Sequence, residues 1–131
     1  MKPSTSSTTV SGIHTVGIPV SDQAGALAFY VEKMGLEKRL DAAFGAGRWI
    51  EVAPPGATTS IALVPAPDGA AIGVDTGIRF STADAESAHA SLLAAGVDTD
   101  PEVIRMGEFV PPMFAFRDRD GNRLVIVEEA A

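Results

Sequence analysis

The chain carries two hydrophobic patterns, one typical of strands and one typical of helices, and the pair occurs twice in the same order. The first copy, residues 13–35, begins with a β-rich run whose apolar residues alternate up to Val20, as in a half-buried strand. Ser21 and Asp22 follow, and both side chains accept hydrogen bonds from the first amides of a helix. Apolar residues three and four apart then predict a helix that closes at Gly35, a residue suited to the left-handed conformation.

The second copy, residues 77–96, repeats this order with a short strand, a capping Asp84, an Ala-rich helix and a closing Gly96. Such repetition predicts one structural unit used twice. Further strands are predicted at 36–41, 48–52 and 60–64 in the first unit, and at 102–106, 113–117 and 123–127 in the second. The predicted organisation is a disordered leader at 1–10 and one domain at 11–131, made of module one at 11–65, a linker at 65–75 and module two at 76–131.

Alternation along the predicted strands assigns each side chain to one of two sheet faces. Ile50 and Val52 fall on the face that the helices cover, so Trp49 and Glu51 fall on the opposite face, which we expect to line a cavity. The Trp49 indole suits a planar or cationic ligand, or it packs against a partner subunit or loop. Arg79 lies on the same face of the second unit. Its guanidinium is expected to pair either with a carboxylate or phosphate of a ligand, or with Glu51. We favour the pair with Glu51.

Four further apolar residues are candidates for an adaptable wall beside a ligand, although core packing is the default role of such side chains. They are Phe44, Met106, Phe109 and Met113.

Composition narrows the possible functions. The 131 residues include no cysteine, which excludes disulfides, thiolate metal sites and cysteine nucleophiles and fits a cytoplasmic protein. The net charge of −7, with ten dispersed Lys and Arg residues, disfavours nucleic-acid binding. Neither a signal peptide nor a run of membrane-spanning length is present in the sequence, so we expect no membrane partner.

Two βαβββ modules with the segments IPVSD, AFY and RDRDGN resemble the vicinal oxygen chelate superfamily, which includes glyoxalases, bleomycin resistance proteins and extradiol dioxygenases. The resemblance implies an α+β fold in which paired modules form curved mixed sheets around a cleft. It also implies a homodimer, because members commonly pair through these sheets.

The resemblance implies a metal site at four positions, which here are Thr15, Ala62, Gly77 and Val125. None of these side chains replaces an imidazole or carboxylate ligand, so we expect no metal cofactor and place the chain in the metal-free branch. His14 neighbours the first position but shares the parity of the helix face, which predicts packing against a helix or loop. A β-bulge would turn it into the cavity.

The leading hypothesis is therefore a metal-free protein that binds, and as a resistance protein sequesters, a small molecule. One alternative is a metal-dependent lyase, isomerase or dioxygenase with a relocated site that includes His14. The other is a metal-free enzyme that uses Glu51 as a base, which requires surroundings that tune the pKa of its carboxyl group.

Overall fold

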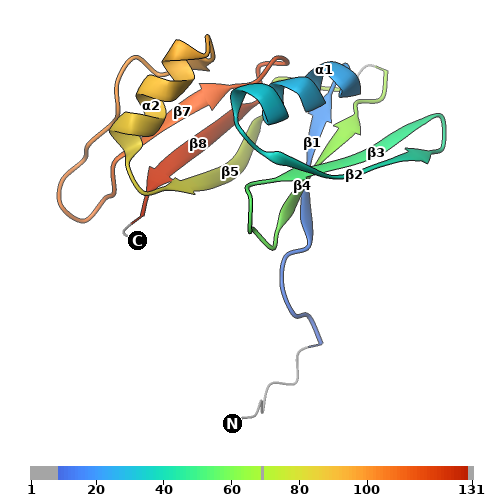
Figure 1. Ribbon diagram of the computed structural model, residues 1–131, viewed down its shortest axis with the longest axis horizontal. Coiled ribbons are helices and arrows are strands. Elements are labelled where there is room, and N and C mark those ends of the chain that lie inside the picture. Colours follow the sequence, from blue (N-terminus) through green and yellow to red (C-terminus); the bar gives the residue numbers. More distant parts are fainter. Residues whose placement is uncertain (1–8, 69, 130–131) are drawn as a thin grey trace.

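The computed structural model describes residues 9–68 and 70–129, and each half contains a strand, a helical segment and three strands (Figure 1). This order confirms the repeated unit. The first half contains β1 (Thr15–Val20), α1 (Gln23–Ala28), the π-helical turn η1 (Phe29–Lys33), β2 (Glu37–Phe44), β3 (Gly47–Ala53) and β4 (Ser60–Pro65). The second half contains β5 (Asp75–Thr82), α2 (Ala85–Ala94), β6 (Asp98–Thr99), β7 (Met113–Arg117) and β8 (Arg123–Glu128).

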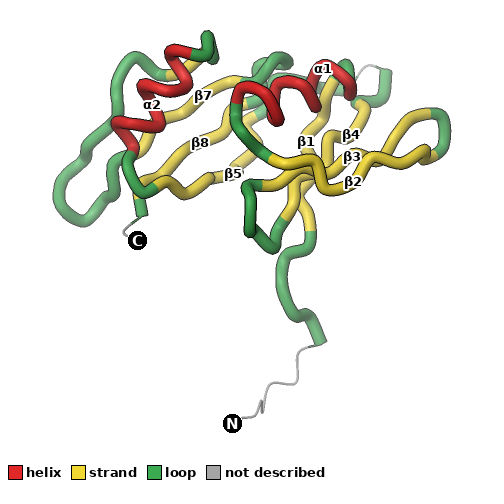
Figure 2. Tube along the Cα trace, viewed as in Figure 1, coloured by secondary structure: helices red, strands yellow, loops and turns green. Residues whose placement is uncertain are grey.

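The strands form two four-stranded mixed sheets, ordered β1-β4-β3-β2 and β5-β8-β7-β6. In each sheet the first strand pairs in parallel with the last strand of its own module, and the other pairs are antiparallel. Both helices lie on one side of the sheets (Figure 2). We call this side the helix face and the opposite side the open face. The first strand of each module, β1 or β5, lies at an edge of its sheet.

One hydrophobic core on the helix face joins the two modules. Ile18, Tyr30 and Ile50 from module one belong to the same buried cluster as Phe114 and Phe116 from module two, and all five are fully buried. Burying an aliphatic or aromatic side chain of this size contributes about 1.5–3 kcal/mol. A shared cluster therefore couples the stability of the two modules.

The predicted helix ends are confirmed. Asp22 Oδ1 accepts from the backbone N–H of Gly25 at 3.1 Å, and Asp84 Oδ1 accepts from that of Ser87 at 3.1 Å. These bonds satisfy amides that have no partner within the helix. Gly35, with φ of 75°, allows the chain to turn from the first helical segment into β2.

The strand predicted at 102–106 is wrong. Only an isolated bridge between Ile104 and Met113 forms there, and the second strand of module two is the two-residue β6. Pro101 removes a backbone donor just before this segment, and Gly107 adopts a φ of 96° just after it, so a longer ladder cannot form.

Candidate functional site

A polar and aromatic cluster lies on the open face of module one. Trp49 Nε1 donates to Glu51 Oε2 at 2.7 Å, and the hydroxyl of Ser60 donates to Glu51 Oε1 at 2.7 Å. The Phe44 ring meets the Trp49 indole edge-on, with centroids 5.7 Å apart. We call Phe44, Trp49, Glu51 and Ser60 the open-face cluster. It confirms that Trp49 and Glu51 lie opposite the buried Ile50 and Val52.

Hydrogen bonding keeps the Glu51 carboxylate charged. The bonds from Ser60 and Trp49 lower the pKa of Glu51, desolvation opposes them, and the nearby charge of His14 lowers this pKa further. A general base works best when its pKa lies near the operating pH. With both oxygens engaged and a lowered pKa, Glu51 is better suited to orient Trp49 than to remove protons.

The predicted ion pair between Arg79 and Glu51 is wrong. The side chain of Arg79 is exposed and donates to the Gly77 carbonyl at 3.3 Å. Glu51 has its partners within module one, whereas Arg79 lies on β5, an edge strand of the other sheet.

The four residues predicted to form an apolar wall are split between the two ends of the molecule. Phe44 closes the β2–β3 hairpin, while Met106 and Phe109 belong to the loop before β7, at the opposite end of the long axis (Figure 1). Their exposed fractions are 66%, 57% and 92%, so their default assignment to core packing is wrong. Met113 is half-buried at the start of β7.

The four positions of the superfamily's metal site lie on or beside the inner strands. The Thr15 hydroxyl donates to the Ser60 carbonyl at 3.2 Å, and Ala62 lies opposite Glu51 in the sheet. Val125 pairs with Arg79. Gly77, with φ of 74°, lies within an irregular part of β5. Within residues 9–68 and 70–129, no three His, Asp or Glu side chains are grouped so as to hold a metal ion.

The two histidines take different environments. His14 is exposed and precedes β1, so strand alternation does not fix its direction, and the prediction that it packs against a helix or loop is wrong. His89 is buried, with Nε2 2.7 Å from the Asp100 carbonyl and its ring edge-on to Phe114 at 5.0 Å. It packs α2 onto the sheet.

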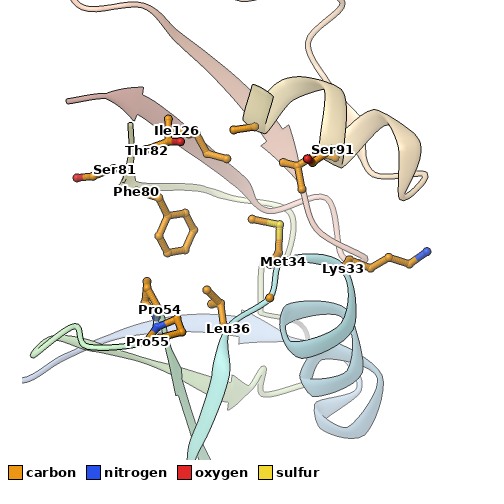
Figure 3. A pocket seen from close by; sticks show the side chains of 13 residues that line it. Lys33, Met34, Leu36, Pro54, Pro55, Phe80, Ser81, Thr82, Ser91 and Ile126 are labelled. Carbon is orange, nitrogen blue, oxygen red and sulfur yellow. The ribbon is translucent and has the colours of Figure 1, made fainter. Parts of the chain in front are cut away.

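Two adjoining cavities, of about 290 and 300 Å³, lie between the modules and share Pro54, Phe80 and Ser81. We call them together the inter-module groove. The Phe80 ring projects from β5 toward Pro54, Pro55 and Leu36 (Figure 3). The sequence analysis missed this groove, because its walls come from segments far apart in the chain. Its one local signal is the Pro-Pro-Gly turn after β3.

Two mixed sheets built from repeated βαβββ units, with both helices on one face (Figure 2), define a class of paired-module proteins. The chain belongs to the Glyoxalase/Bleomycin resistance protein/Dioxygenase superfamily, whose family model matches residues 12–126. The resemblance inferred from the sequence is thus confirmed at the level of the superfamily and its fold. The part of the chain that the structure describes contains no helix long and apolar enough to cross a membrane.

Similar proteins of known structure include TnmS3, an antibiotic binding protein from Streptomyces sp. CB03234. It shares 31% identity with a TM-score of 0.82, over 94% of this chain and 99% of that chain. A superfamily member from Sphaerobacter thermophilus shares 36% identity with a TM-score of 0.84, over 92% and 98%. The YetH protein of Bacillus subtilis is 31% identical over 123 residues, covering 91% of this chain and 99% of YetH.

Proposed function

We propose that this protein binds a small molecule without a metal and acts by sequestering it. One observation carries the proposal. The positions at which metal-binding members of the superfamily hold their ion are Thr15, Ala62, Gly77 and Val125. Only Thr15 has a side-chain oxygen, and its hydroxyl is bonded to a backbone carbonyl. Hydrocarbon and glycine positions offer no lone pairs to a divalent ion.

The similarity to TnmS3, an antibiotic binding protein, supports a binding role over a catalytic one. So does the state of Glu51, whose lowered pKa weakens it as a base at neutral pH. We place the ligand on the open-face cluster, where an indole held in position by Glu51 presents its face to a planar or cationic compound.

We further propose that the protein is a homodimer paired through the open faces of its sheets. Phe44 and Trp49 lie at one end of the long axis of the molecule, and Met106, Phe109 and Met113 lie in or next to a loop at the other end (Figure 1). A second, antiparallel copy brings its loop over the open-face cluster of the first. In this dimer the predicted apolar wall is formed by Phe44 of one chain and by Met106, Phe109 and Met113 of the other. The absence of cysteine supports placing this dimer in the reducing cytoplasm.

The proposal predicts that the only tryptophan reports on binding. A panel of planar aromatic compounds, beginning with the cation proflavine, is titrated into the protein while Trp49 fluorescence is recorded. We expect quenching that saturates. Trp49→Ala, measured by calorimetry, weakens binding by on the order of 1 kcal/mol beyond the area lost. Trp49→Phe, which keeps an aromatic face, loses less.

The rival role for Trp49 is to hold the two subunits together without contacting the ligand. In that case Trp49→Ala dissociates the dimer and leaves the affinity of each folded site unchanged. The thermal unfolding of both variants is the control for folding. Because Trp49 lies opposite the buried Ile50 and Val52, we expect Trp49→Ala to unfold close to the wild-type temperature.

A further inference from the structure

The inter-module groove has a charge composition unlike that of the whole chain. The protein carries a net charge of −7, yet no Asp or Glu is among the described residues that line either cavity. Two cationic residues do line it. Lys33 contributes its alkyl stem, since its ammonium donates to the Ala95 carbonyl at 2.7 Å and points away from the cavity (Figure 3). The second is Arg79.

Arg79 is the exception among the seven arginines of the chain. The other six, all in the described part of the chain, form ion pairs with Asp or Glu. Among the described residues, Arg79 donates only to the Gly77 carbonyl, at 3.3 Å, and its side chain is exposed. The Glu129 carboxylate near the same strand is engaged by the Ser81 hydroxyl at 2.6 Å. The Arg79 guanidinium is thus available to an external anion.

Beyond Arg79 the walls of the groove combine apolar side chains from both modules with several serine and threonine residues. Phe80 and Ile126 face Met34, Leu36 and Pro54 across the first cavity (Figure 3). Each cavity lies near the lower end of the size range of small-molecule sites, about 300–1,000 Å³. Two adjoining cavities suit an elongated ligand better than a compact one.

We propose that the inter-module groove binds an amphipathic carboxylate, with its carboxylate on Arg79 and its apolar body along Phe80 toward Met34. An arginine matches a carboxylate with two parallel hydrogen bonds. Burying the hydrocarbon body of the ligand against the apolar side chains of the groove stabilises the complex. This site adjoins the open-face cluster through Ser60, which lines the second cavity, but Phe44, Trp49 and Glu51 line neither cavity.

The test is a titration of ¹⁵N-labelled protein with octanoate, followed by amide chemical shifts. Octylammonium and 1-octanol, which share the apolar body, are titrated in parallel. We expect octanoate to bind most tightly, and the largest shifts to fall at Gly35, Phe80, Ser81 and Ser91. Trp49 fluorescence stays unchanged, so failure of this site is distinguishable from failure of the open-face site.

Two variants separate the head and body interactions. Arg79→Gln weakens octanoate binding about tenfold through loss of a charge-assisted pair, while the matched Arg105→Gln, at an exposed arginine elsewhere, has no effect. Ser91→Phe places a ring in the cavity from the exposed side of α2 and abolishes binding. Thermal unfolding confirms that each variant is folded. Equal binding of octanoate and octylammonium, unchanged affinity in Arg79→Gln, or shifts centred on the open face would overturn the proposal.

Discussion

At the scale of single residues, the hydroxyl of Tyr30 joins the two modules. It donates to Asp118 Oδ2 at 2.7 Å inside the core. The amide of Asn122 donates to the same oxygen at 3.0 Å and to the Pro19 carbonyl at 2.9 Å. The turn of module two is thus bonded to the helix and first strand of module one. A fully satisfied network of buried polar groups fixes one relative placement of the elements that carry it.

This network predicts a loss of stability in alkali. Burial, followed by the charge of Asp118, raises the pKa of Tyr30 well above its ordinary value. The folded chain keeps the phenol proton when the unfolded chain loses it, above about pH 10. The folded state then binds more protons, so the free energy of unfolding falls as the pH rises through this range.

Tyr30→Phe is the matched variant. It lowers the free energy of unfolding at neutral pH by about 1–2 kcal/mol, because a buried bond is lost. It also flattens the decline above about pH 10. Urea unfolding across pH measures both effects, and absorbance near the phenolate band follows the one tyrosine of the chain directly. A phenol that titrates normally in the folded protein would contradict this account.

At the scale of elements, two carboxylates accept hydrogen bonds from the first backbone amides of α2. Asp84 Oδ1 accepts from the Ser87 amide at 3.1 Å, and Glu128 Oε1 accepts from the Ala85 amide at 3.0 Å. The second bond ties the end of β8 to the start of the helix. It places Glu128 on the helix face, as its parity with Leu124 and Ile126 indicates. Negative charge at a helix N-terminus is also favoured by the helix dipole.

Substitutions of the helix cap Asp84 are expected to lower the free energy of unfolding by different amounts. Asp84→Ala lowers the free energy of unfolding by about 1 kcal/mol, and Asp84→Asn stays near wild type, because asparagine caps as well as aspartate. Urea unfolding at neutral pH measures the series, and equal slopes show that the unfolded states are comparable. Wild-type stability in Asp84→Ala would show that Glu128 alone satisfies the helix start.

Most elements were predictable because their signals are local. Caps, closing glycines and alternation placed both helices and seven of the eight strands near their observed positions. The second strand of module two was misplaced at 102–106. Its true pairing, Asp98 with Arg117 and Thr99 with Phe116, spans a long loop. Sequence alternation cannot show which edge of a sheet such a short segment joins.

At the scale of the whole molecule, the candidate sites depend on contacts that no local pattern contains. Strand alternation predicted that Trp49 and Glu51 share a face, and the structure adds their hydrogen bond. Strand alternation did not reveal that Ser60 donates a hydrogen bond to Glu51, nor that Arg79 borders a groove. Those facts follow from how the strands and modules are placed in three dimensions.

The proposed dimer predicts a mass of two chains by light scattering at working concentration. Phe109→Lys shifts this mass toward one chain, because a side chain that is 92% exposed in the single chain would otherwise be buried, contributing about 1.5–3 kcal/mol. Leu93→Lys, at an exposed apolar residue of α2, is the control and keeps the dimer. A wild-type mass of one chain removes the dimer from the account.

The central claim is that binding needs no metal. The most direct measurement combines elemental analysis of protein purified without chelator with calorimetric titration of the tightest planar ligand from the panel, before and after EDTA. The account predicts less than one metal ion per chain and the same affinity in both titrations. One Ni, Zn, Mn or Fe ion per chain, lost with EDTA together with ligand binding and dependent on His14, would contradict it.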